Sequence, residues 1–223
     1  MSEEVKSKKS RQGATPRKEA DIITVAANIA ASWKNRPGLI LAWTTPDSLT
    51  DAAGIFKTSV TVRNETKGDR AVITRTLQSI NTEVDQSVRY VKGYIADMFQ
   101  AKEAPVYYGQ FGIAKERGRF KMPDDNDKRQ LALEQMVKAI DRHGMGDRKY
   151  GNPYWTNIYE QFVQAKSRAS DSDSSSAEHV SIKTEQKALI RKTLNALIHL
   201  IKANYPDTWK EEMRIWGFQK EKY

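Results

Sequence analysis

The sequence contains no cysteine among its 223 residues. Composition alone therefore excludes disulfide bonds, thiolate metal sites and thiol nucleophiles. The absence does not identify a cellular compartment, because many cytosolic proteins have few cysteines.

Long apolar segments are also missing. The longest early stretch without charge, Ile22 to Trp33, is shorter than the roughly 18 residues that a membrane-spanning helix needs. Residues 1–10 are polar where a secretory signal would carry an apolar core. We therefore expect no membrane span and no export by the secretory route, and we take the cytoplasm as the default location.

What the chain does contain is typical of a folded basic protein. It has 37 Lys and Arg against 28 Asp and Glu, a formal net charge of +9, and 39% hydrophobic residues. This length can bury a real core in one large domain or two small ones. The charge attracts polyanions in general, so by itself it does not separate nucleic acid from an acidic protein surface.

Apolar residues recur at helical spacing in the first half. Ile22 to Trp33 form one face of a helix that stops before Pro37-Gly38, and Thr45-Pro46 supply the cap and first-turn proline of a second helix. After Lys67-Gly68-Asp69, apolar residues from Ile73 to Met98 alternate steps of three and four. A helix of some 30 residues is about 45 Å long, and we expect it to be the spine of a bundle.

The second half of the sequence is also predicted to be helical. A helix starts at the acidic run Asp124–Asp127, which we interpret as a helix start rather than a metal site because the calcium-loop spacing is absent. The glycine-rich segment 144–153 is interpreted as an interhelical turn, and Pro153 opens the next helix. The Ser and Asp run at 169–178 predicts a flexible loop before a late helix around residues 189–201.

These patterns predict an all-α fold: a helical bundle of about six or seven helices, with one long spine helix, an irregular or hairpin central segment and a short C-terminal amphipathic helix. We place a flexible basic tail at 1–18, a first helical half at 19–101, an irregular basic and aromatic connector at 102–123 and a second helical half at 124–223. We expect one domain overall.

No local pattern identifies an active site. The sequence has no serine elbow and no carboxylate pair of defined spacing, and its histidines, His143, His179 and His199, have no helical partner for zinc. We therefore predict no catalytic residue, no metal ligand and no cofactor. An enzyme whose residues assemble without a local motif remains the third functional hypothesis.

The basic segments are the candidates for polyanion binding. Four cations between residues 115 and 121 alternate with Glu116, Gly118 and Phe120, so an extended chain would place all four on one face beside aromatic residues. Such a face can bind single strands. The alternative is a solvated hairpin that its aromatics hold to the bundle. The candidate residues, including two cations of the glycine-rich turn, are Lys115, Arg117, Arg119, Lys121, Arg148 and Lys149.

The C-terminus predicts a docking helix with Asp207 as its N-cap and Gly217 at its end. A helix this short is marginal alone in water, so its apolar face must dock on the protein's own bundle or in a partner's groove. The docking residues are Trp209, Met213, Trp216 and Phe218.

Four segments carry a family resemblance: Asn204 to Trp209, Arg214 to Tyr223, Tyr108 to Ile113 and Met122 to Asp124. Together they resemble an uncharacterised family of bacterial all-helical proteins. The resemblance implies a helical architecture and transfers no functional site.

The leading functional hypothesis is a non-enzymatic helical scaffold or adaptor that binds another macromolecule. Its partner would be another protein or a second copy of the chain. The alternative is a nucleic-acid-binding protein that uses its basic patches.

Overall fold

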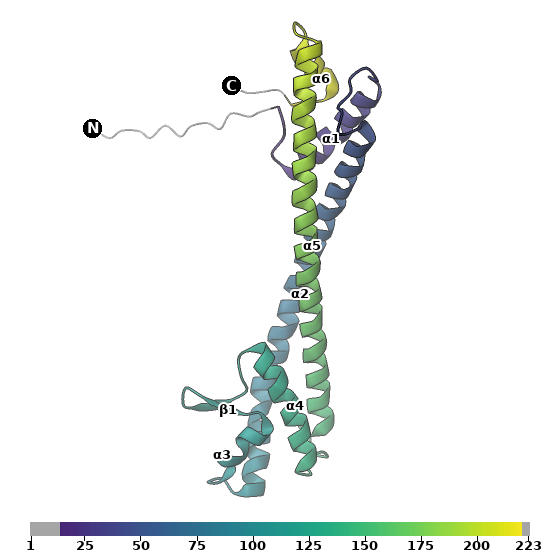
Figure 1. Cartoon of the computed structure of the whole chain (residues 1–223). Coiled ribbons are helices and arrows are strands. Elements are labelled where there is room, and N and C mark those ends of the chain that lie inside the picture. The colour runs from purple at the N-terminus through teal and green to yellow at the C-terminus, as the bar shows by residue number, and fades with distance from the viewer. Residues whose placement is uncertain (1–13, 220–223) are drawn as a thin grey trace, which may run out of the picture. The chain divides into compact units, whose positions relative to one another are not determined.

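The computed structural model describes residues 14–219, most of which are helical (Figure 1). In chain order the elements are α1 (Glu19–Lys34), α2 (Pro46–Phe99), α3 (Ala104–Tyr107), the 3-10 helix η1 (Tyr108–Phe111), β1 (Ala114–Glu116), β2 (Arg119–Lys121), α4 (Asn126–Arg142), α5 (Asn152–Asn204) and α6 (Trp209–Trp216). The predicted all-α class is confirmed. Within the described residues, no helix is both long enough and apolar enough to cross a membrane.

Helix α2 is longer than the sequence pattern predicts. It starts at Pro46, where Ser48 N donates to the predicted cap, Thr45 Oγ1, at 3.1 Å. It then runs to Phe99 without the expected break near Gly68. A glycine inside a helix costs about 1 kcal/mol relative to alanine. That cost does not end the helix, because half-buried Thr66 and Ile73 continue one face on either side of Gly68.

Helix α5 corrects a second prediction. Residues 169–178, expected to form a flexible loop, are helical within it. Half-buried Ala169 and Ser172 continue the spacing of the buried Phe162 and Ala165, and Asp173 pairs with Arg70 of α2 at 3.0 Å. Serine and aspartate have low intrinsic helix propensity, but packing of one helix face outweighs propensity in a folded protein.

The chain forms two compact units. Unit 1 contains the residues up to Thr66 together with those from Ser175 onward, and unit 2 is the continuous segment Lys67–Ser174. Helices α2 and α5 each contribute one part to unit 1 and the other part to unit 2. Each unit therefore contains residues from both sequence halves.

The core of unit 1 combines α1, the first part of α2, the last part of α5 and α6. The predicted face of α1 is buried from Ile22 to Trp33. The Trp33 indole donates to the Leu39 carbonyl at 2.6 Å, which fixes the loop after α1. Of the tail predicted at 1–18, residues 1–13 lie outside the described residues, and Ala14 and Pro16 are buried.

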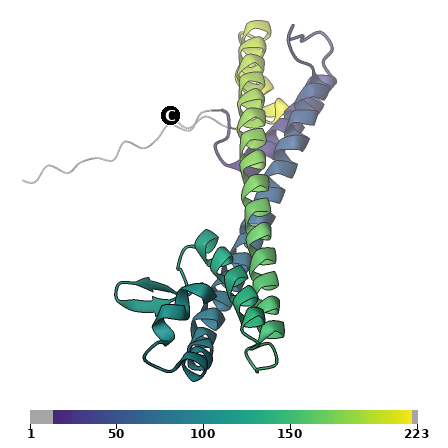
Figure 2. The same cartoon turned by 60° about the horizontal axis from the view of Figure 1, so that its bottom comes forward.

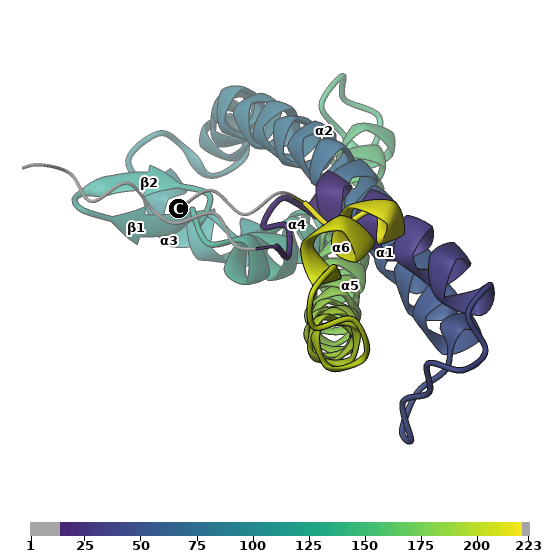
Figure 3. The same ribbon diagram turned by 90° about the horizontal axis from the view of Figure 1, so that it is seen from above.

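Helix α6 packs against α1 within unit 1 (Figure 3). Its N-cap is Thr208 and not the predicted Asp207, because residues 206–208 form a turn and the helix begins one residue later. Gly217 ends it with a φ of 93°, and Phe218 N donates to the Met213 carbonyl at 2.9 Å. This Schellman arrangement returns Phe218 to the core, as the sequence predicts.

Unit 2 has its own core, and glycine permits one close approach within it. Large buried side chains from α2, η1, α4 and α5 are Val84, Val91, Ile95, Phe111, Leu133, Met136, Trp155 and Phe162. Gly112, with a φ of 70°, follows η1, and a Cβ there would lie 2.3 Å from the Ala132 carbonyl oxygen of α4. Only glycine lets η1 pack this closely on α4.

A buried arginine connects three parts of unit 2. The Arg129 side chain of α4 is 3% exposed and forms an ion pair with Asp85 of α2 at 3.1 Å. It also donates to Asn81 Oδ1 at 3.0 Å and, from Nε, to the Pro123 carbonyl at 2.6 Å. A buried charge is tolerated when its donors have partners, so Arg129 holds α2, α4 and the segment after β2 together.

The central segment contains the hairpin that was one of the two predicted alternatives (Figure 2). Strands β1 and β2 pair antiparallel, with Lys115 opposite Phe120 and Glu116 opposite Arg119. The connecting residues Arg117 and Gly118 both have positive φ, 48° and 80°, which is typical of a two-residue type I′ turn.

Candidate functional site

The predicted face of four cations does not exist in the hairpin. Residues opposite one another in an antiparallel pair project from the same face, and neighbours along a strand project from opposite faces. Lys115 therefore lies on one face with Phe120, whereas Arg119 and Lys121 lie on the other. One cationic face required an extended chain; in the hairpin, which was the alternative interpretation, the turn at Arg117 reverses the chain halfway through the series and divides the cations.

Local contacts also engage two lysines near the hairpin. Lys121 pairs with Glu116 at 3.1 Å and with Asp124, and the hydrogen bond that Lys121 donates to Asp124 raises the pKa of Lys121. Lys92 of α2 donates to the Phe120 carbonyl, and burial lowers the pKa of Lys92. The Lys92 contact holds the hairpin to α2, and the carboxylates of Glu116 and Asp124 neutralise the charge of Lys121.

The other two predicted cations, Arg148 and Lys149, lie beside a group of tyrosines. We call Arg89, Tyr90, Tyr94, Arg148, Lys149 and Tyr150 the tyrosine–cation surface. It combines one side of α2 with the loop between α4 and α5, all within unit 2. Lys92, which contacts the hairpin, and Tyr94, which contacts this loop, project from different sides of α2. The structure therefore places Arg148 and Lys149 on a different side of α2 from the hairpin.

Two tyrosine rings form the centre of this surface. Tyr90 and Tyr150 stack with ring centres 4.2 Å apart and planes 3° from parallel. Tyr150 meets Tyr154 edge-on at 4.9 Å, and its backbone nitrogen donates to the Tyr94 hydroxyl at 3.4 Å. Tyr90 is 37% exposed, so the stack reaches solvent.

The loop that carries Arg148, Lys149 and Tyr150 has a fixed conformation. A Cβ on Gly151 would lie 2.0 Å from the Gly146 carbonyl oxygen, which also accepts from Asn152 N at 3.2 Å. Gly144 has the positive φ predicted for this turn, 64°, and the Met145 side chain is buried in the core of unit 2. These contacts present the two cations and the tyrosine on a rigid backbone.

The three cations of the surface differ in their partners. Arg148 pairs with Asp97 at 2.9 Å and lies 4.7 Å from the centre of the Tyr94 ring. Arg89 donates to the Tyr90 hydroxyl at 2.9 Å, and Lys149 lies 5.6 Å from the centre of the Tyr150 ring. Between residues 14 and 219, no carboxylate lies within ion-pair distance of Arg89 or Lys149.

Tyrosine ionisation responds to these neighbours. The hydrogen bond from Arg89 lowers the pKa of Tyr90, whereas burial raises the pKa of Tyr150. Burial also raises the pKa of Tyr154 to about 12. Tyr154 therefore stays protonated at neutral pH, and its hydroxyl donates to Glu83 at 3.0 Å and lies 2.6 Å from Ser87 Oγ.

The chain of Glu83, Tyr154 and Ser87 has no arrangement suited to nucleophilic catalysis. Ser87 is 4% exposed, so its hydroxyl does not face a substrate. Its partner Tyr154 is a neutral phenol with a raised pKa, which makes it a poor acceptor of the serine proton. These contacts instead hold α2 and the first turn of α5 together beneath the tyrosines.

The other residues considered in the sequence analysis have structural contacts. Asp125 caps α4 by accepting from Asp127 N at 3.1 Å and Lys128 N at 3.0 Å, which confirms the helix-start interpretation of the acidic run. His143 packs between Phe99 and Phe111. Within the described part of the chain, no group of three or more His, Asp or Glu side chains is arranged to hold a metal ion.

The C-terminal docking residues lie in the core of unit 1. Met213, Trp216 and Phe218 are at most 5% exposed there, and Trp209 packs against the same core. Lys202 Nζ lies 4.4 Å from the centre of the Trp209 ring. In the folded chain, α6 therefore docks on the core of unit 1.

Sequence reasoning missed Arg89, Tyr90, Tyr94 and Tyr150. A signal was present, because Tyr90 lies off the apolar stripe of its helix and Tyr94, four residues later, lies at the edge of that stripe. An aromatic on the polar side of an amphipathic helix indicates a contact outside the core of that helix. Nothing local, however, links them to Tyr150, which is distant in sequence.

Comparison of the chain with protein-family models, with curated proteins and with solved structures finds no match.

Proposed function

We propose that the protein is a non-enzymatic helical scaffold that binds another macromolecule through the tyrosine–cation surface. The observation that carries the proposal is the solvent-exposed stack of Tyr90 on Tyr150, at 4.2 Å, beside Arg89 and Lys149, which have no carboxylate partner among residues 14–219. The core of unit 2 is made of other side chains, so these two rings are not part of it.

The chemistry of this surface is that of an interface. Tyrosine and arginine are enriched among the residues that dominate binding energy, because both combine apolar contact area with hydrogen bonding. A ring already held in a stack loses little conformational entropy when a partner covers it. The glycine-fixed loop adds to this preorganisation, because it holds Lys149 and Tyr150 in position before binding.

A nucleic-acid ligand is the second candidate function. Arg89 and Lys149 favour it, because cations that pair with no carboxylate in the described part of the chain are available to phosphates. An acidic protein would use the same charges, so the two candidates must be separated by experiment.

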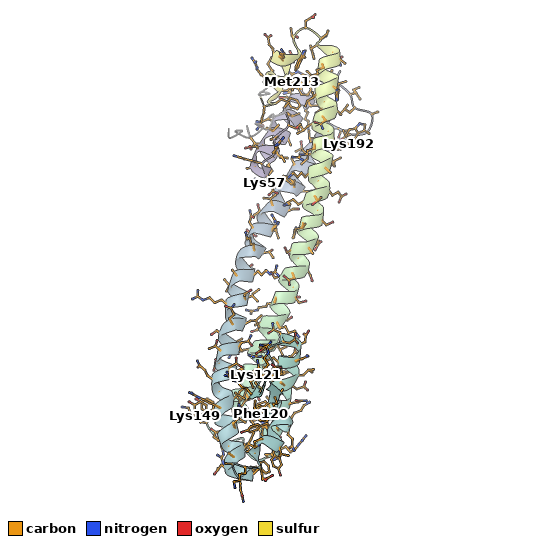
Figure 4. The ribbon with its side chains drawn as sticks, turned by 90° about the vertical axis from the view of Figure 1, so that its left-hand side faces the viewer. Lys57, Phe120, Lys121, Lys149, Lys192 and Met213 are labelled. Atoms are coloured by element: carbon orange, nitrogen blue, oxygen red, sulfur yellow. The ribbon has the colours of Figure 1, made fainter. Side chains whose placement is uncertain are left out.

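The test is capture of partners by the tagged full chain from an extract of its source cells, with and without nuclease. A Tyr90→Ala/Lys149→Gln variant alters the surface, and Lys57→Gln serves as control because Lys57 is an exposed lysine of unit 1 (Figure 4). We expect a macromolecule at fixed stoichiometry that the wild type and the control retain and the surface variant loses. Equal capture by all three proteins, or capture by none, would overturn the proposal.

A further inference from the structure

We infer that the ligand of the tyrosine–cation surface is single-stranded nucleic acid, an inference that rests on the proposed function and specifies its partner. Two features of the site act together. The parallel rings of Tyr90 and Tyr150 provide an aromatic stack in which Tyr90 is 37% exposed, and Arg89 and Lys149 lie over these two rings and provide charge.

The geometry matches the two parts of a nucleotide. A base has a flat π-face that stacks on tyrosine or on a guanidinium plane, and the phosphate on either side of it carries a negative charge. The Arg89 guanidinium lies 4.8 Å from the centre of the Tyr90 ring, so it can stack with a base or pair with a phosphate beside that ring. Lys149, next to Tyr150 in sequence, places a second charge at the other end of the stack.

A duplex fits this surface less well than a single strand. Bases inside a duplex are already stacked on one another, and a tyrosine reaches their faces only after they are unstacked. At this surface the Tyr90 ring of α2 lies against the loop between α4 and α5, so that loop covers part of the helix face that would have to enter a major groove. An acidic peptide would pair with Arg89 and Lys149, but its repeating unit has no flat π-face to stack on the Tyr90 ring.

The test measures binding of the full chain to a labelled oligothymidine of about 20 nucleotides, a length that exceeds the usual single-strand site. A duplex of equal length and polyglutamate are the comparison ligands. Tyr90→Ala removes the ring, and Tyr90→Phe keeps the ring without its hydroxyl. We expect Tyr90→Ala to weaken oligothymidine binding between about 5-fold and 150-fold and Tyr90→Phe to change it little, since stacking requires the ring alone.

Salt dependence gives a second readout that loss of folding would not imitate. Each phosphate contact to a single strand contributes about 0.7 to the slope of log K against log salt. Lys149→Gln should lower this slope by about that amount, whereas Lys57→Gln, a matched change of one exposed lysine, should leave it unchanged (Figure 4). Thermal unfolding of each variant confirms that it is folded.

The outcomes separate this inference from the proposed function. Absence of oligothymidine binding, equal affinity of Tyr90→Ala and wild type, or a preference for polyglutamate would overturn the nucleic-acid inference. If the capture experiment then still yields a nuclease-resistant partner that Tyr90→Ala/Lys149→Gln loses, the scaffold function stands with a protein ligand. If that capture also fails, both are overturned.

Discussion

The two units of the chain use their aromatic side chains in different ways. Unit 1 buries Trp33, Phe56 and Trp216 in its core. Unit 2 also buries aromatics but keeps Tyr90 and Tyr150 in a stack that reaches solvent. In unit 1 these residues contribute mainly to stability, whereas the exposed stack of unit 2 gains most when another molecule covers it.

The units also differ in the partners of their buried polar side chains. In the core of unit 1, Ser59 and Thr193 each donate to a carbonyl of their own helix, Ile55 and Leu189. Unit 2 buries the charged Arg129, whose partners lie on other elements. Changes to the core of unit 1 should therefore act through lost apolar burial, and changes at Arg129 through lost connections between elements.

The largest effect is expected from truncation after Tyr205, which removes α6. Unit 1 then loses the buried side chains of Met213, Trp216 and Phe218, each worth about 2–4 kcal/mol. Unit 1 should lose more than about 5 kcal/mol of stability, whereas unit 2 should keep its own. Amide hydrogen exchange resolved along the chain measures this difference. Equal loss of protection in both units would show that they unfold as one body.

A charge in the core of unit 2 should have the next largest effect. Val88 is 4% exposed, and Val88→Asp places an unpaired carboxylate among apolar neighbours at a cost of about 4 kcal/mol. Gln86→Asp adds the same carboxylate at an exposed position of α2 and should change stability by less than about 0.5 kcal/mol. Urea unfolding compares the two variants, and similar midpoints would place Val88 outside the core.

Arg129→Met tests whether the connections of the buried arginine matter. The variant keeps an apolar stem of similar length but leaves the Pro123 carbonyl and Asn81 without their donor. We expect the free energy of unfolding to fall by about 2–3 kcal/mol. This is less than the cost of breaking an ion pair in which both partners are buried, because Asp85 is half exposed and water can solvate its carboxylate. Chemical denaturation measures the loss. A variant as stable as the wild type would mean that apolar packing replaces the network.

The smallest expected effect concerns pH and Tyr154. Its pKa rises from 10.0 to about 12 in the folded protein, so its stabilising contribution is complete below pH 10 and is lost as pH rises through 12. Because the side chain is only half-buried, solvent screens part of the effect, and we expect this contribution to be about 1 kcal/mol or less. Thermal unfolding at pH 9 and pH 11.5 should show a smaller drop for Tyr154→Phe than for the wild type. Identical drops would mean that Tyr154 ionises normally.

The sequence predicts the helical elements well where apolar spacing is regular. The buried face from Ile22 to Trp33 and the Gly217 turn follow from spacing and backbone chemistry alone. The breaks predicted at Gly68 and at residues 169–178 were wrong, because local propensity carries no information about the packing that continues a helix.

The candidate site was only half predictable for a related reason. Arg148 and Lys149 stand out as cations in a glycine-rich turn, and the structure places them in the tyrosine–cation surface. Their partners Tyr90 and Tyr94 come from a helix more than fifty residues earlier, and only tertiary structure brings them together. The hairpin cations failed as a group because the register of β1 and β2, set by a two-residue turn, divides them between two faces.

The division of the chain into units has a consequence for the order of folding during synthesis. Unit 2 is one uninterrupted segment, so all of its contacts become available once Ser174 has left the ribosome. Unit 1 requires residues up to Thr66 to meet residues from Ser175 onward, and this loop closes only after the whole of unit 2 has been made. Until then α1 lacks the contacts that α5 and α6 supply to the core of unit 1. Folding of unit 2 shortens the loop that must close between residues before Lys67 and residues after Ser174.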